Sequence, residues 1–124
     1  MKAIVATTDE KMYVKEFTGG VFEAAEKEVG GFAEYVHPRR LPAPYCMFVN
    51  EDGLLMNLPQ NLRGSFCYMT AGHGHPIVGN IVIMKDAFVD GEPSIVGLDD
   101  EDVEYLVKLI DTISDGTIER EEDR

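Results

Sequence analysis

The sequence contains no tryptophan, only two cysteines and no long apolar run in its 124 residues. Two cysteines cannot form the disulfide framework of a small secreted scaffold, and Cys46 and Cys67 each lie in an apolar run that predicts a buried thiol. No apolar run approaches the roughly 18 residues that are needed to cross a bilayer. The start of the chain predicts a strand and not a signal peptide. We therefore expect a cytoplasmic protein with no membrane contact.

Basic residues are too few to form a nucleic-acid footprint. The formal net charge at pH 7 is −12, and the one basic cluster is Arg39 and Arg40 in the proline-rich segment 37–42. Because binding to a phosphate backbone begins with a basic surface, direct nucleic-acid binding is not expected. The sequence also lacks the motifs of nucleophile-elbow hydrolases, P-loop enzymes, zinc proteases and dinucleotide-binding enzymes. We therefore predict a protein that is not an enzyme and that needs no cofactor.

The acidic residues that are present lie mainly at one end of the chain. Residues 1–85 carry 8 lysines and arginines against 9 acidic residues, a net charge of −1, whereas residues 86–124 carry 3 against 14, a net charge of −11. Such an asymmetry is typical of an acidic terminal element or tail. We expect a single domain over residues 1–115 and an acidic, disordered tail over residues 116–124.

Hydrophobic patterns predict a sheet of short strands and two helices. Segment 21–29 has apolar residues on one helical face, with Thr18 as a candidate cap. Segment 98–113 has a longer apolar stripe, with Asp99 as N-cap and Asp102 at the capping-box position. Strands are predicted at 2–7, 12–17, 32–37, 45–50, 54–58 and 77–85. The fold class is α+β, an antiparallel or mixed sheet of five to seven short strands with a short helix and a C-terminal amphipathic helix packed on one face.

The stretch 45–65 contains a predicted turn and a polar corner. Its "NEDG" predicts the turn of a β-hairpin, with Gly53 in the left-handed conformation. Pro59 would end the second strand, and Asn61 could cap a short helical turn through "LRGS", so the segment that follows is open between strand and short helix. Residues 86–97 are expected to form a turn-rich connection.

Four segments, in this order, resemble a known family. They are "VGGFAEYV" at 29–36, "MFVNEDGLLMNLPQNLRGS" at 47–65, "PIVGNIVIMK" at 76–85 and the acidic "LDDEDVEYLVKLI" at 98–110. Together they resemble the domain-of-unknown-function 3846 (DUF3846) family, small proteins found on phages, plasmids and other bacterial mobile elements. "RRLPAPY" and "AGHGHP" depart from the family pattern. The resemblance implies a fold unit, a phage or mobile-element origin and a cytoplasmic location, and it implies no activity.

Two sets of polar side chains are candidates for a ligand or metal site. Asn57, Asn61 and Arg63 could bind a ligand, with the guanidinium holding a phosphate or carboxylate. Alternatively, the amides satisfy the turning backbone and Arg63 pairs with a carboxylate of the chain. His73 and His75 are weak candidates for metal ligands, because a structural site needs further ligands and the neighbouring glycines are typical of a loop.

Acidic residues of the terminal helix are candidates for partner binding, although a charged helix face is usually only solvated. They are Asp100, Glu101, Glu104 and Asp111. The leading hypothesis is a non-enzymatic accessory protein of a phage or mobile element that acts through contacts with an unknown protein partner. The alternatives are an acidic DNA-mimic inhibitor of a host nuclease or restriction system, and a small-ligand or metal-binding protein. A homodimer stays open.

Overall fold

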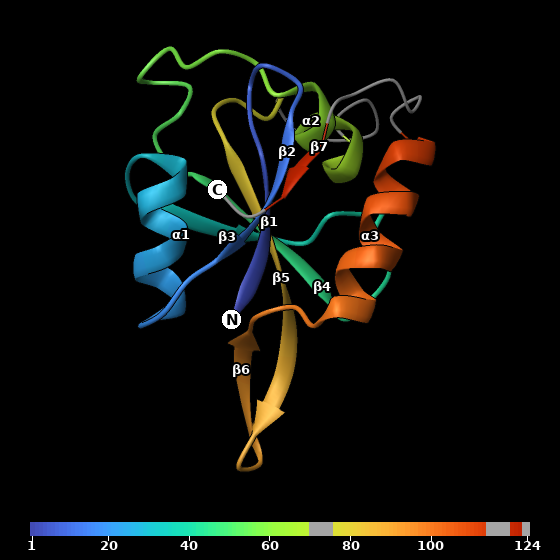
Figure 1. Cartoon of the computed structure of the whole chain (residues 1–124). Helices are drawn as coiled ribbons and strands as arrows, with labels where there is room; N and C mark the ends of the chain where they lie inside the picture. The colour runs from blue at the N-terminus through green and yellow to red at the C-terminus, as the bar shows by residue number, and fades with distance from the viewer. Residues whose placement is uncertain (70–75, 114–119, 123–124) are drawn as a thin grey trace.

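Pairs of strands alternate with single helices along the part of the chain that the computed structural model describes, residues 1–69, 76–113 and 120–122. In chain order, they are β1 (Lys2–Ala6), β2 (Met12–Glu16), α1 (Val21–Val29), β3 (Ala33–Val36), β4 (Tyr45–Asn50), α2 (Leu62–Tyr68), β5 (Ile81–Val89), β6 (Glu92–Val96), α3 (Asp100–Ile113) and β7 (Arg120–Glu122) (Figure 1). The predicted α+β class is confirmed. The segment left open between strand and helix forms the helix α2.

The strands form one mixed sheet in the order β3-β4-β5-β1-β2-β7, with β6 paired to β5 beside this path. Every pair is antiparallel except β2 and β7, which are parallel. β5 lies at the centre, as its apolar sequence predicts. Its first half pairs with β4 and β1, and its second half continues with β6 as a hairpin that extends away from the rest of the molecule (Figure 1).

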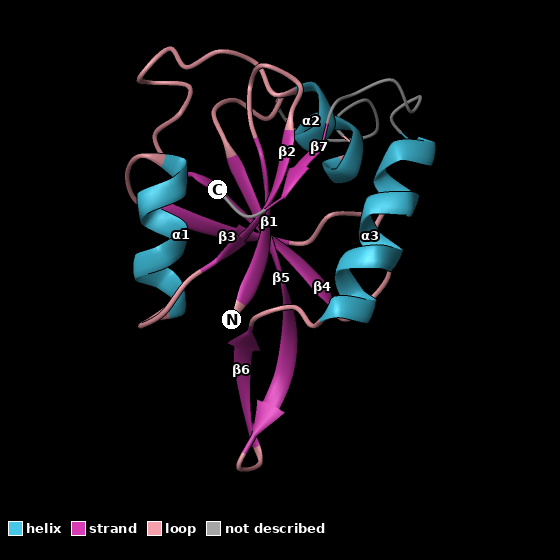
Figure 2. Ribbon diagram, viewed as in Figure 1, coloured by secondary structure: helices cyan, strands magenta, loops and turns pink. Residues whose placement is uncertain are grey.

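Helices cover both faces of the sheet, not one face as expected from the sequence (Figure 2). Successive residues of a strand point to opposite faces, so β5 sends Ile81 and Ile83 toward α3 and Val82 and Met84 toward α1. The two layers have separate cores. The core beneath α1 contains Ala3, Val5, Tyr13, Ala25, Val29, Cys46, Phe48, Val82 and Met84. The core beneath α2 and α3 contains, among others, Ile4, Met12, Met47, Cys67, Ile81, Ile83, Leu106 and Ile110.

The start of α3 has the capping box that the sequence predicts. The Asp99 carboxylate accepts the backbone N–H of Asp102 at 2.8 Å, and the Asp102 carboxylate accepts the N–H of Asp99 at 3.0 Å. Each bond satisfies a helix-terminal donor that would otherwise have no partner in the helix. Leu106 and Ile110 are buried against the sheet, so the predicted apolar stripe faces the core. The short helix α1 also forms, but its N-cap is Gly20 without a side-chain bond, not Thr18.

The predicted hairpin at "NEDG" is wrong. β4 already pairs with β3 on one edge and β5 on the other, so no edge remains for a strand over 54–58. Residues 51–57 instead form consecutive turns. Asn57, not Gly53, has positive φ, at 56°. Gly53 is needed for space, because a Cβ there would lie 2.7 Å from Cγ2 of Val78.

The connection expected over 86–97 is also wrong, because a β-hairpin occupies this segment. β5 runs on to Val89, and β6 begins at Glu92. Asp90 and Gly91 between them have φ of 53° and 80°. Positive φ at both central residues is the signature of the two-residue turn whose twist matches that of the flanking strands.

The acidic C-terminal segment lies only partly within the described residues. Residues 120–122 form the short strand β7, which pairs with β2 from Met12 to Val14. The backbone of these three residues therefore pairs with a neighbouring strand, whereas the sequence predicts a disordered tail here. Residues 116–119 and 123–124 lie outside the described residues.

Candidate functional site

Asn61 is the centre of the polar corner, and its side chain is fully used within the chain. Its amide nitrogen donates to the carbonyl oxygens of Ala6 and Gly79, both at 2.9 Å. Its amide oxygen accepts the backbone N–H of Gly64 at 2.8 Å, which caps α2 as the sequence predicts. Because the residue has no exposed surface, its three bonds tie the end of β1, the approach to β5 and the start of α2 together.

Arg63 is the second residue of α2 and is 1% exposed. Its Nη1 donates to Asp111 Oδ1 of α3 at 3.0 Å, so the guanidinium joins the two helices. Its Nε and Nη2 atoms have no hydrogen-bond partner within the described residues. Asn57, in contrast, is exposed in the turn before the corner. The structure therefore places Asn61 and Arg63 inside the fold and Asn57 on the surface, and it does not gather the three around one hollow.

Three acidic side chains of α3 make ion pairs, and one of these, Asp100, is itself exposed. Asp100 pairs with Lys2, and Asp111 pairs with Arg63. Asp102 accepts a bond from Lys85 at 2.6 Å and from the Tyr45 hydroxyl at 2.7 Å. The remaining two acidic residues on this helix, Glu101 and Glu104, are exposed.

Asp102 is the most strongly held of these carboxylates. Burial alone would raise its pKa, but bonds from Lys85, from the backbone N–H of Asp99 and from Tyr45 outweigh it and lower the pKa to about 2. Burial, followed by the bond to the Asp102 carboxylate, raises the pKa of Tyr45 above its usual range. The group is therefore a charged anchor between α3 and the sheet at neutral pH.

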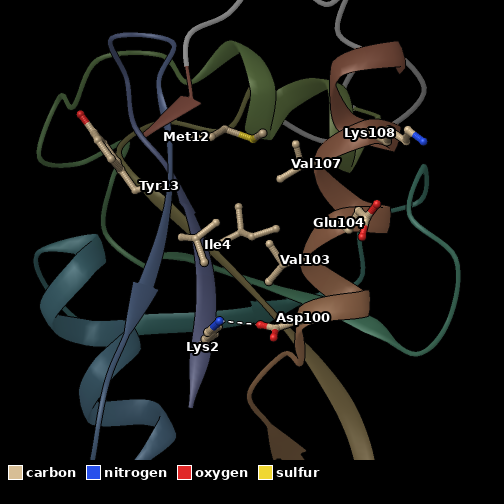
Figure 3. Close-up of a pocket in the computed structure, with 10 residues that line it drawn as sticks. Lys2, Ile4, Met12, Tyr13, Asp100, Val103, Glu104, Val107 and Lys108 are labelled. Carbon is tan, nitrogen blue, oxygen red and sulfur yellow. Dashed lines mark hydrogen bonds and ion pairs between the residues drawn. The ribbon is translucent and has the colours of Figure 1, made fainter. Parts of the chain in front are cut away.

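A cleft of about 480 Å³ separates the sheet from α3 (Figure 3). Figure 3 shows Ile4 and Met12 on the sheet side and Val103 and Val107 on the helix side, with the Lys2–Asp100 ion pair at one end. Its other charged lining residues are Glu104 and Lys108. The described lining contains no serine, cysteine or histidine, so the cleft offers apolar contact and charge of both signs and lacks those nucleophiles.

The two thiols are buried, as the sequence predicts. Burial raises the pKa of both Cys46 and Cys67 to about 12, so neither is a reactive thiolate at neutral pH. In residues 1–69, 76–113 and 120–122, no three histidine, cysteine or acidic side chains form a cluster that could hold a metal ion. His73 and His75 lie outside those ranges.

A feature that sequence reasoning missed is an exposed group of large apolar side chains at one end of the sheet. We call it the apolar tip, and it consists of Phe32, Leu54, Leu55 and Met56. Leu55 is 88% exposed and Phe32 is 67% exposed. A possible signal was the run "LLM" directly after a turn, because three adjacent apolar residues cannot all face one side of a strand.

Comparisons with known proteins place the chain in a family of undefined activity. In the part of the chain that the structure describes, no helix has the length and apolar character of a membrane span. No curated protein and no solved structure matches the chain. One family model, the domain of unknown function DUF3846, matches residues 1–111 and so covers all four segments on which the resemblance rested. The chain therefore belongs to the DUF3846 family.

Proposed function

We propose that this protein is a non-enzymatic accessory protein that acts in the cytoplasm by binding a protein partner at the apolar tip. The observation that carries the proposal is the exposure of four large apolar side chains beside one end of the β3–β4 pair. They are Phe32, Leu54, Leu55 and Met56, and each is more than half exposed. A phage or mobile-element origin is part of the proposal and rests on the family resemblance alone.

The four side chains of the tip surround one end of the β3–β4 pair. Phe32 and Met56 line a hollow beside Asn50, and Leu54 lines another with Val36 and Val49. The turn lies in the long loop that leads from β4 to α2 across the top of the molecule (Figure 1). Several large exposed apolar side chains at one end of a sheet are more typical of an interaction site than single exposed apolar residues are.

The tip is held in place by a buried asparagine. Asn50 donates to the carbonyl oxygen of Val29 at 3.0 Å and accepts the backbone N–H of Asp52 at 2.8 Å. Phe32 is joined to the same turn, because its carbonyl accepts the N–H of Glu51 at 2.8 Å. A surface that is already ordered loses less conformational entropy when a partner binds. The ordered turn is therefore better suited to binding a partner than a flexible loop would be.

The charges around the tip indicate the chemistry of the partner. The lining of its two hollows includes the acidic residues Glu26, Glu34, Glu51 and Asp52, and one lysine, Lys27. An apolar centre within a mainly negative rim is complementary to a partner surface with an apolar centre and lysine or arginine residues around it. We therefore expect a basic-rimmed protein partner.

A DNA-mimic inhibitor is the second candidate, and exposed Glu101 and Glu104 on α3 support it. Mimicry needs several unpaired carboxylates at phosphate-like spacing. Asp100, Asp102 and Asp111 instead make ion pairs within the chain. The apolar tip therefore has the stronger structural support of the two.

The test is capture of a partner from the native host by the immobilised full chain, followed by binding of the purified partner to variants. We expect the double variant Leu54→Ser/Leu55→Ser to lose at least tenfold in affinity, since burial of each leucine contributes roughly 1.5–3 kcal/mol. The matched control Glu101→Gln/Glu104→Gln should bind like the original chain, and binding should persist at high salt. If the control variant loses binding, or if high salt abolishes binding of the original chain, the binding is electrostatic, and the DNA-mimic hypothesis replaces this proposal.

A further inference from the structure

A shallow hollow of about 510 Å³ lies on the α1 face of the sheet, where the start of α1 meets β3, β5 and β6. Its lining consists of Val21, Phe22, Tyr35, Asp86, Pro93, Ser94 and Ile95. None of these residues belongs to the apolar tip or to the cleft beside α3. The hollow is therefore a separate feature, and it combines aromatic rings, aliphatic walls and a single carboxylate.

The carboxylate is that of Asp86, and it is half-buried without a cationic partner. Both of its oxygens lie 2.8 Å from the Tyr35 hydroxyl, which donates to them. No lysine or arginine of the described residues makes an ion pair with Asp86. The neighbouring Lys85 cannot do so, because adjacent strand residues face opposite sides, and its ammonium binds Asp102 on the α3 face.

Several other half-buried carboxylates of the molecule are compensated by a cation. The other half-buried carboxylates of the described ion pairs, Glu28, Asp102 and Asp111, bind Lys15, Lys85 and Arg63. Asp86 has the neutral Tyr35 phenol for compensation, and that hydroxyl also lies 3.0 Å from Nε2 of His37. Each carboxylate oxygen has a second acceptor site, so the bond from Tyr35 leaves capacity for another donor.

The aromatic side of the hollow is fixed by a buried ring. Phe22 and Tyr35 each pack edge-to-face against Phe48, with ring centroids 5.2 Å and 5.9 Å away. Phe22 is nevertheless 53% exposed, so its ring is available to a ligand. The positive end of α1 would repel a cation, but Glu23 in its first turn supplies a compensating negative charge.

We propose that this hollow binds the side chain of an arginine from a peptide or protein. The planar guanidinium can donate to the Asp86 carboxylate and lie against the Phe22 ring, while its aliphatic stem contacts Val21, Pro93 and Ile95. Arginine fits better than lysine because its fork of donors matches a carboxylate and its flat group stacks on an aromatic ring. The proposal does not depend on the apolar tip, with which the hollow shares no residue.

The experiment is an amide-detected NMR titration of the full chain with N-acetyl-arginine amide. We expect saturable shift changes confined to amides near Phe22, Asp86 and Ser94. The neutral citrulline analogue should give none, and N-acetyl-lysine amide should bind more weakly than the arginine probe. Shifts that do not saturate, that follow the acidic face of α3, or that citrulline reproduces would overturn the proposal.

Variants then separate the site from general acidity. Asp86→Asn keeps an acceptor for the Tyr35 hydroxyl and removes the charge, so it should fold normally and bind the arginine probe about tenfold more weakly, as expected for the loss of a charge-assisted bond. Tyr35→Phe keeps the charge and should retain binding. Glu10→Gln, a control that removes one exposed carboxylate in the turn between β1 and β2, should bind like the original chain. Equal binding by Asp86→Asn and the original chain would refute the site.

Discussion

Two neighbouring regions of the chain, the turns at 51–57 and the corner that follows them, reverse the usual rule of burial. In the turns, Leu54, Leu55 and Met56 are exposed to solvent. In the corner, Asn61 and Arg63 are buried. The apolar side chains therefore lie outside and the polar ones inside, within a single stretch of the sequence.

The difference separates side chains that hold the fold together from side chains that neither core uses. Every hydrogen-bonding atom of the Asn61 side chain is used by the chain itself, so nothing of that amide remains for a ligand. Leu54 and Leu55, by contrast, are exposed and belong to neither core. The sequence predicts a polar site at Asn61 and Arg63 and a strand at 54–58, whereas the structure buries the polar side chains and exposes the apolar ones.

The largest effect on stability is expected at the corner. Asn61→Ala removes three hydrogen bonds and leaves the carbonyls of Ala6 and Gly79 and the N–H of Gly64 buried without this partner. Each lost bond costs roughly 1 kcal/mol, so we expect the free energy of unfolding to fall by roughly 3–4 kcal/mol. Urea unfolding measures this change. A loss of under about 1 kcal/mol would show that the corner is not the anchor described here.

The ion pair between α2 and α3 gives the next effect, and its two partners should behave differently. Asp111→Ala leaves the Arg63 guanidinium buried without its carboxylate, and we expect a loss of roughly 2–3 kcal/mol. Arg63→Met removes the charge together with two donors that have no described partner, so the change should be under about 1 kcal/mol. Denaturant unfolding of both variants tests this asymmetry. If both variants lost the same free energy of unfolding, the positive charge of Arg63 would itself stabilise the fold.

Acid should weaken the contact between α3 and the sheet through Asp102. The pKa of this group is about 2 in the fold, below its ordinary value of 3.8. Its contribution is therefore present above about pH 4 and is lost as the pH falls toward 2. We expect about 1–2 kcal/mol, with allowance for partial screening by solvent. Unfolding at pH 5 and pH 2 should show a smaller difference for Asp102→Asn than for the original chain.

The terminal helix was predictable because its signals are local. Asp99, Asp102 and the apolar stripe that follows lie within a few turns of one another, and the capping box forms as expected. The predicted hairpin at "NEDG" and the predicted turn-rich connection over 86–97 were both wrong, because strand pairing is not local. "NEDG" follows a strand whose two edges are already taken by β3 and β5, whereas the "DG" of 90–91 joins two strands that have a free edge to share.

The candidate sites show the same limit. The sequence indicates that Asn61 caps a helical turn, but Ala6 and Gly79, which accept its other bonds, are 55 and 18 residues away. The ion pair of Arg63 with Asp111 crosses 48 residues. Exposure of the apolar tip depends on the pairing of β4 with β3 and β5, so the run "LLM" at 54–56 is a signal that only this pairing makes interpretable.

The smallest effect on stability is expected in the turns, and it completes the contrast with Asn61→Ala. Leu55 is 88% exposed, so Leu55→Ser removes almost no buried apolar surface, and the free energy of unfolding should change by no more than about 0.5 kcal/mol. Leu58→Ser, at the less exposed end of the same loop, is the matched control and should destabilise more. Thermal and urea unfolding of both variants measure the difference. A large fall in the free energy of unfolding of Leu55→Ser would mean that this side chain stabilises the fold. That result would contradict the proposal that the apolar tip is a partner-binding surface.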